Sequence, residues 1–127
     1  MPRKSKPGSR YPDDWKALAL QVKEEAGWKC TRCNHPHDPA SGHTLTIHHL
    51  DMDRGNCRWW NLIPLCQKCH LQIQHKVILE RSWIFSHSSW FKPYVAGYYA
   101  NINELDDSRP VVEAEMDRII EQYQLRV

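Results

Sequence analysis

The sequence contains no long apolar run and no large excess of charge of either sign. Its 127 residues include 17 lysines and arginines and 15 aspartates and glutamates, and the net charge of +2 does not by itself indicate a class of partner. A membrane-spanning helix needs about 20 consecutive apolar residues, and no segment approaches this length. The first residues also lack the apolar segment of a secretory signal peptide. We therefore expect no membrane partner and a reducing, cytoplasmic location.

The charges nearly balance, but they are unevenly distributed. Residues 1–10 contain four basic residues and no acid, whereas residues 101–127 contain seven acids and three bases. The basic segment includes Pro and Gly and has no apolar periodicity, which predicts a flexible basic arm over residues 1–12. Such an arm can follow DNA phosphates through counterion release, or it can be a solubilising tail. The composition favours neither interpretation.

Four of the five cysteines form two Cys-x-x-Cys pairs, Cys30/Cys33 and Cys66/Cys69. In a reducing compartment, paired cysteines are typical of metal ligands rather than disulfides. Four thiolates complete one tetrahedral Zn²⁺, and a gap of two residues lets both sulfurs of a pair reach the metal from one tight turn. We therefore expect a structural zinc site, in which Cys57 takes no part.

The interval between the two cysteine pairs has the pattern of a hairpin. Residues 44–50 alternate between apolar and polar, which predicts a strand. A turn-rich segment over residues 51–56 leads towards a short apolar strand, which Pro64 confines to a sheet edge or to the strand's end. Neighbouring residues of a strand point to opposite faces, so His48 and His49 are not expected to do the same task. A helix is expected to open at the second cysteine pair and to extend to about Arg81.

Three short motifs in this region resemble the HNH endonucleases, which have a ββα-metal fold. They are IHHLD at 47–51, NLIPLC at 61–66 and CQKCH at 66–70, and the resemblance covers about half of the chain, roughly residues 28–76. It implies an α+β protein with a small ββα-metal core, stapled by the four-cysteine zinc site and flanked by helices. It also implies an enzyme that hydrolyses DNA phosphodiester bonds with the help of a metal.

The resemblance assigns roles to four polar residues. His49 takes the position of the general base that accepts a proton from the attacking water, a task suited to an imidazole with a pKa of about 6.5. His48 and His70 take the positions of ligands to a catalytic divalent ion. This ion would be Mg²⁺ or Mn²⁺, with Ni²⁺ or Zn²⁺ possible because imidazole ligands favour them. Asn61 takes the position of the residue that fixes the catalytic histidine's ring by hydrogen bonding.

The sequence departs from a common pattern of that family four residues after His70. Many members place another His there, whereas this chain has Gln74 followed by His75. On an unbent helix, position 74 lies about 40° from His70 and position 75 about 140° from it. Because Gln is a weak ligand, we expect His48 and His70 to hold the ion, and His75 to lie at the surface or to face DNA.

Other polar residues near the motif are candidates for lesser roles. Asp51 and Asp53 are expected to fold the turn by accepting hydrogen bonds from nearby backbone N–H groups, with contact to a metal as the alternative. Tryptophans beside two of the arginines would make a basic, aromatic rim for nucleic acid, although they are equally suited to the core. Loop histidines at 35, 37 and 43 are expected to be solvated rather than to bind metal. The candidate DNA-binding residues are Arg54, Arg58, Lys68 and Lys76.

Apolar residues at helical spacing predict three helices outside the motif region. Asp13 can cap the first, which Gly27 stops. Ser89 can cap the second, and Ser108 with Pro110 starts the third. The aromatic side chains of this C-terminal part are expected to pack on the zinc core, with a partner surface on the acidic last helix as the alternative.

Three parts of the chain are therefore expected. Residues 1–12 form the arm, residues 13–83 form the HNH domain with its N-terminal helix, and residues 84–127 form a helical extension packed on that domain. The favoured function is DNA cleavage, by nicking or through both strands, with a homodimer or a larger complex as possible partner. The alternatives are a zinc-stabilised DNA-binding or adaptor module without turnover, and a subunit of a phage packaging or defence complex. The enzyme is favoured because a binding module has no reason to keep His49, Asn61 and His70 together.

Overall fold

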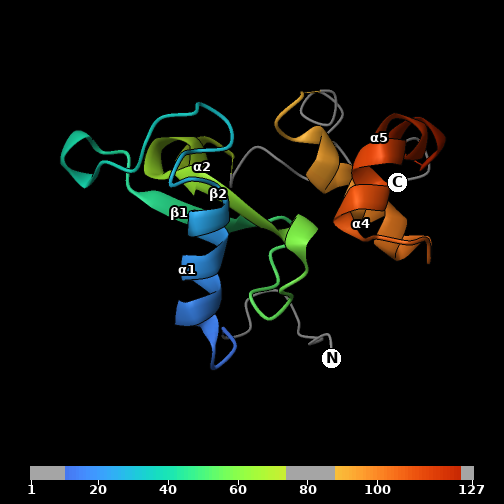
Figure 1. Ribbon diagram of the computed structural model, residues 1–127, viewed down its shortest axis with the longest axis horizontal. Coiled ribbons are helices and arrows are strands. Elements are labelled where there is room, and N and C mark those ends of the chain that lie inside the picture. Colours follow the sequence, from blue (N-terminus) through green and yellow to red (C-terminus); the bar gives the residue numbers. More distant parts are fainter. Residues whose placement is uncertain (1–10, 74–87, 124–127) are drawn as a thin grey trace. The chain divides into compact units, whose positions relative to one another are not determined.

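The computed structural model describes residues 11–73 and 88–123, and the chain divides into two compact units, residues 1–76 and 77–127 (Figure 1). The mixture of helices with a two-stranded sheet agrees with the predicted α+β class. No helix of the described ranges is long and apolar enough to cross a membrane. The predicted boundary between residues 83 and 84 falls outside the described residues, and the packing of the C-terminal extension on the first domain stays a prediction.

An antiparallel hairpin forms the centre of the first unit. Strand β1 (Leu45–His49) pairs with β2 (Leu62–Cys66), and the register places Leu45 opposite Cys66 and His49 opposite Leu62. All five residues of β2 are buried. Pro64 is tolerated because each strand of a two-stranded sheet is an edge, as predicted. Its carbonyl, in turn, accepts a hydrogen bond from the backbone N–H of Thr31, at 2.9 Å, which ties the first cysteine pair to β2.

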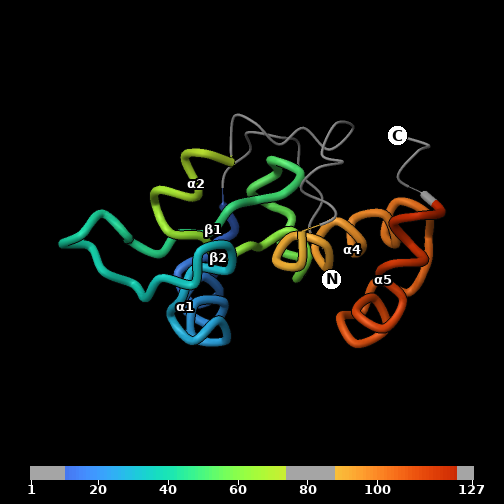
Figure 2. Tube along the Cα trace, turned by 90° about the horizontal axis from the view of Figure 1, so that it is seen from above, coloured from blue at the N-terminus to red at the C-terminus, as the bar shows by residue number. Residues whose placement is uncertain are grey.

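Two helices lie on opposite sides of this hairpin. Helix α2 (Gln67–Ile73) begins directly after β2 and contacts both strands, while α1 (Trp15–Glu25) contacts β2. In both views the strands lie between α2 and α1 (Figure 2). Side chains that alternate along β1 therefore meet either α2 or α1. Residues 74–87, including the predicted continuation of α2 to Arg81, lie outside the described part of the chain.

The ends of α1 differ slightly from the prediction. Its N-cap is Asp14 rather than Asp13, and the cap makes no side-chain hydrogen bond. At the other end, Gly27 has a φ of +66° and its N–H donates to the carbonyl of Glu24. This left-handed backbone conformation suits glycine and stops the helix, as predicted.

The second unit contains two helices packed against each other. They are α4 (Lys92–Ile102) and α5 (Arg109–Tyr123). The N-cap of α4 is Phe91, not the predicted Ser89, because the carbonyl of Phe91 accepts the first bonds of the helix, from the N–H groups of Tyr94 and Val95. Three apolar residues of the predicted last helix are buried in the core, as expected: Val112, Ile119 and Ile120.

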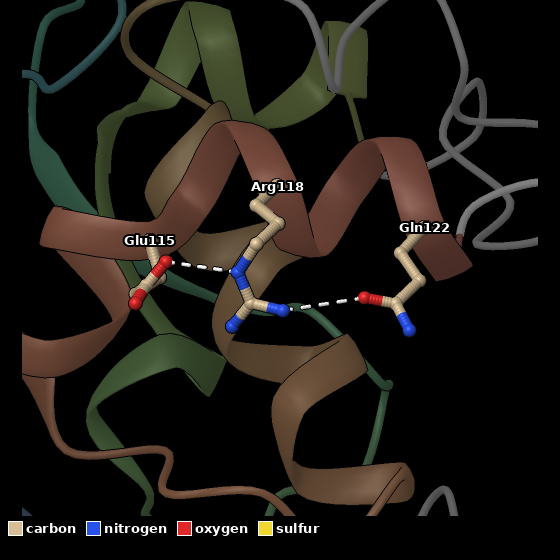
Figure 3. A network of polar contacts seen from close by, with 3 residues as sticks. All are labelled: Glu115, Arg118 and Gln122. Carbon is tan, nitrogen blue, oxygen red and sulfur yellow. Dashed lines mark hydrogen bonds and ion pairs between the residues drawn. The ribbon is translucent and has the colours of Figure 1, made fainter.

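The outer face of α5 is charged. Arg118 donates to Glu115 at 2.9 Å and to Gln122 at 3.3 Å along one side of the helix (Figure 3). Lys92 of α4 reaches Asp117 of α5 at 2.8 Å. Exposed ion pairs contribute little to stability, so the buried apolar contact between α4 and α5 is the main source of their association.

We expect Leu65→Ala to lower the free energy of unfolding by about 2–5 kcal/mol, because this side chain of β2 is fully buried and its loss leaves a cavity. Leu71→Ala is the matched control: Leu71 is 58% exposed on α2, and we expect its truncation to change stability by less than about 0.5 kcal/mol. Urea unfolding in zinc-containing buffer measures both variants. Equal losses would contradict the core assigned to the hairpin.

Candidate functional site

The four predicted zinc ligands lie together. Cys30 and Cys33 come from the turn after α1, Cys66 ends β2 and Cys69 lies in α2. Their Sγ atoms all lie within 4.8 Å of one another, and those of Cys33 and Cys66 are 3.7 Å apart. A tetrahedral ion with Zn–S bonds of about 2.3 Å has sulfurs about 3.8 Å apart. The cluster can therefore hold a metal ion such as zinc.

Backbone hydrogen bonds shape the first cysteine pair. The N–H of Cys30 donates to the carbonyl of His35, and the N–H of Asn34 donates back to the carbonyl of Cys30. Asn34 adopts a left-handed φ of 63°, which closes this turn. Inside the turn, the N–H of Cys33 points to the Sγ of Cys30 at 3.4 Å. Such donors stabilise a thiolate at the position where a metal needs one.

The thiols differ in how easily they ionise. Burial raises the pKa of Cys30, but hydrogen bonds from the backbone at Cys33, Cys66 and Arg32 outweigh it and leave this pKa below its usual value. Burial and the negative charge of Cys30 raise the pKa of Cys69. Four sulfurs so close together cannot all be anionic without a positive charge between them. The cluster therefore has the electrostatics of a cation site, whereas Cys57 lies outside it.

His48 of β1 and His70 of α2 form a second group. Their ring centroids lie 5.3 Å apart with the planes at 74°. Burial is the main cause that lowers the pKa of His48 to about 4, and burial also lowers the pKa of His70. Both rings are therefore neutral near pH 7 and keep a lone pair for a metal. Centroids about 5 Å apart suit two imidazoles that converge on one ion with bonds of about 2.1 Å.

Two ligands alone leave an open site. Within residues 11–73 and 88–123, the cysteine cluster is the one group of three or more metal-binding side chains. Gln74 and His75, the candidates for a third ligand after His70, lie outside the described residues. An ion held by His48 and His70 would therefore keep positions for water or for substrate oxygens, as catalytic metal sites do.

His49 lies on the other face of β1, as the alternation predicted. Its ring contacts those of Trp15 and Tyr11, with centroids 5.1 Å and 5.7 Å away. The Nε2 atom is buried and has no hydrogen-bond partner among the described residues. Burial lowers the pKa of His49 to about 4, against the opposing charge of Asp51. The ring thus holds a neutral, buried nitrogen, and the aromatic rings of Tyr11 and Trp15 form a cover against it.

Sequence reasoning missed this aromatic cover. Trp15 belongs to a helical stripe that is expected in the core, and Tyr11 falls within the predicted arm. Their rings stack with centroids 4.8 Å apart, and the Cζ atom of Arg54 lies 5.2 Å from the centroid of Tyr11. Tyr11 is 41% exposed, so the cover reaches the surface. No signal in the sequence placed residue 11 beside residue 49.

Asn61 acts on the loop rather than directly on the ring of His49. It is fully buried, and its Oδ1 accepts from the N–H of Asp51 at 2.8 Å. Its Nδ2 donates to the carbonyls of Asn56 at 2.8 Å and Asp53 at 3.3 Å. Both amide hydrogens are therefore used on loop carbonyls. The predicted direct hydrogen bond to the histidine is replaced by a set of bonds that holds the segment following it.

The two aspartates fold this loop, as predicted. The Oδ1 of Asp51 accepts from the N–H of Asp53 at 2.8 Å, and the Oδ1 of Asp53 accepts from the N–H of Gly55 at 2.9 Å. The other oxygen of Asp51 accepts from the Nδ2 of Asn56 at 2.7 Å. Together with Asn61, these bonds satisfy most polar groups of a segment that is largely buried.

The proposed basic rim is only partly at the surface. Trp60 is buried in the core and Trp59 is half-buried. Arg58 donates to the Oδ1 of Asn56 at 3.3 Å, and Arg54 lies over Tyr11 as described above. Lys68 is exposed on α2, whereas Lys76 lies outside the described residues. The contact of these side chains with nucleic acid stays a prediction.

The loop histidines are exposed or half-buried, in agreement with the prediction that they are solvated, but they also make specific contacts. The Nδ1 of His37 accepts a hydrogen bond from the N–H of Leu45 at 2.9 Å, which fixes the start of β1. His35 and His43 stack with centroids 3.6 Å apart and planes at 7°. None of the three belongs to a cluster of metal ligands within the described ranges. Their packing depends on contacts across the loop that composition cannot show.

The hairpin thus carries a thiol cluster at one end and two buried histidines on β1, with a half-buried histidine on α2. No protein-family model, curated protein or solved structure matches this chain. What the arrangement can do follows from its chemistry: it offers soft sulfur ligands in a closed set and neutral nitrogen ligands in an open set.

We expect Cys66→Ser to lose bound zinc and most of the structure of the first unit, because metal binding and folding are coupled in such sites. Cys57→Ser is the matched control and should keep about one zinc per chain, since Cys57 is not in the cluster. Elemental analysis after gel filtration and circular dichroism measure the two effects. Retention of zinc in Cys66→Ser would contradict the assignment.

We expect Asn61→Ala to lower the free energy of unfolding by about 2–4 kcal/mol, because it leaves the N–H of Asp51 and the carbonyl of Asn56 without their partner and removes one of the two bonds to the carbonyl of Asp53. Amide hydrogen exchange at Asp51 should also speed up. Asn103→Ala, which removes a hydrogen bond at a half-buried site in the second unit, is the control. Unchanged exchange at Asp51 would show that Asn61 does not hold the loop.

Proposed function

We propose that this chain is an HNH endonuclease, in which a ββα-metal core, stapled by a four-cysteine zinc site, hydrolyses DNA phosphodiester bonds. The observation that carries this proposal is the pairing of His48 with His70, neutral imidazoles from β1 and α2, with the buried His49 on the opposite face of β1. This open nitrogen site is separate from the thiol cluster.

The separation of the two groups supports an enzyme. A structural zinc site is satisfied by four cysteines alone. Withdrawing three more imidazoles from water, two of them fully and that of His70 in part, has a desolvation penalty, which lowers the pKa of each one. Groups with perturbed pKa values that gather outside a structural site are typical of functional sites.

Each residue then has a task. An ion held by His48 and His70, Mg²⁺ or Mn²⁺ with Ni²⁺ or Zn²⁺ as alternatives, would supply positive charge for the scissile phosphate and the leaving oxygen. His49 accepts the proton of the attacking water at its unpartnered Nε2 once the ring of Tyr11 moves aside. Asn61 keeps the loop after His49 in place. The side chains that would bind flanking phosphates are those of Arg54, Arg58, Lys68 and Lys76.

One such site cuts one strand. Nicking is therefore the minimal activity, and cleavage of both strands requires a homodimer, two successive visits or a place in a larger complex.

A second function is supported by one specific observation. The Nε2 of His49 is buried rather than exposed to water, and two aromatic rings lie against the imidazole. A zinc-stabilised DNA-binding or adaptor module, or a non-cutting subunit of a phage packaging or defence complex, would tolerate such a cover without opening it. The two functions differ in turnover and not in DNA binding.

We expect the zinc-loaded protein, freed of other ions, to nick supercoiled plasmid when Mg²⁺, Mn²⁺ or Ni²⁺ is added. His49→Ala should abolish cleavage while zinc content and circular dichroism stay unchanged, because general-base removal affects only the chemical step. His43→Ala is the matched control, since His43 lies in the loop before β1.

Two outcomes would contradict the proposal. Cleavage by His49→Ala at the wild-type rate would show that His49 is not the general base. No cleavage with any ion, by protein that binds DNA and retains zinc, would favour the binding module instead.

A further inference from the structure

Thr46 lies on β1 two residues before His48, and its hydroxyl makes two contacts. It donates to the backbone carbonyl of Leu65 at 2.7 Å. The same oxygen lies 3.0 Å from the Nδ1 of His70. The register pairs Thr46 with Leu65, so the first contact is local to the sheet, while the second joins the sheet to α2.

The protons of these contacts can be assigned. A carbonyl oxygen only accepts, so the single hydroxyl hydrogen of Thr46 belongs to the bond with Leu65. The oxygen then offers only lone pairs to His70. The Nδ1 of His70 must therefore carry a hydrogen and donate it, which leaves Nε2 as the ring's one lone-pair nitrogen.

The hydroxyl of Thr46, which accepts the bond from His70, is held in place by its own bond to Leu65. Leu65 is fully buried in the middle of the paired strands, and Cys66 of the thiol cluster follows it directly. The hydroxyl of Thr46 is thus fixed by the same hairpin that carries His48. When the imidazole nitrogen that does not bind a metal donates a hydrogen bond to a fixed acceptor, this bond sets both the tautomer and the orientation of the ring.

We propose that Thr46 is a positioning residue for His70: its hydroxyl holds the ring as the Nδ1–H tautomer and leaves Nε2 to bind the divalent ion. The ion-binding part rests on the proposed function, whereas the tautomer does not. The sequence offers no sign of this role, because Thr46 reads as an ordinary β-branched strand residue.

Two variants of the full-length, zinc-loaded protein test the proposal. Thr46→Val has nearly the same shape and the same strand preference but no hydroxyl, and Thr46→Ser keeps the hydroxyl. The tautomer of His70 is read from imidazole ¹⁵N chemical shifts, and ion binding from titration with Mn²⁺. We expect Thr46→Val to lose the pure Nδ1–H state and to bind Mn²⁺ about tenfold more weakly or worse, and Thr46→Ser to resemble wild type in both.

The outcomes are distinguishable from failure of the nuclease function. An unchanged tautomer in Thr46→Val would overturn the proposal, and so would a changed tautomer with Mn²⁺ affinity within twofold of wild type. If wild type binds no Mn²⁺ while Thr46→Val still changes the tautomer, the proposed nuclease function fails and the control of the ring by Thr46 stands.

Discussion

The register of β1 against β2 is the constraint on which the histidine site depends. Side chains alternate along a strand, so a slip of one residue would exchange the faces of His48 and His49. The observed pairing of His48 with Ile63 directs His48 towards α2 and His49 towards α1. Features at both ends of the hairpin hold this register: the thiol cluster at the Cys66 end, and the bonds of Asn61 to the loop at the other.

Burial keeps the nitrogens of the histidines unprotonated, and it also reduces the stability of the fold. Removing the rings from water lowers their pKa values and keeps their nitrogens unprotonated. His70 satisfies its Nδ1 through Thr46, but the Nε2 of His49 remains without a partner among the described residues. A buried polar atom of this kind costs about 1–3 kcal/mol. Uncompensated sites of this sort are expected where function, rather than folding, selects the residue.

The sequence predicted what depends on spacing along the chain. The two Cys-x-x-Cys pairs predicted the thiol cluster, and alternation over residues 44–50 predicted that His48 and His49 face apart. Turn chemistry predicted that Asp51 and Asp53 fold their own loop, and apolar spacing predicted α1, α4 and α5. The N-cap of α4 was misplaced, because the carbonyl of Phe91 rather than that of Ser89 accepts the first bonds of this helix.

The features that the sequence did not predict depend on contacts between residues far apart in the chain, which spacing does not encode. The cover of His49 by Tyr11 and Trp15, the bond of Thr46 to His70 and the bond of Leu45 to His37 join different elements. Asn61 was expected to fix the ring of His49, but its side chain bonds to the loop, because an amide can bond to a ring or to a backbone and only the fold decides which.

The two metal sites that we propose on this hairpin differ in chemistry, so each should select its own ion. Crystals grown with Zn²⁺ and millimolar Mn²⁺ would test this, with anomalous diffraction recorded at both absorption edges. We expect a zinc peak among Cys30, Cys33, Cys66 and Cys69, and a separate manganese peak within bonding distance of His48 and His70. Zinc among the thiolates with no manganese at the histidine pair would contradict this expectation.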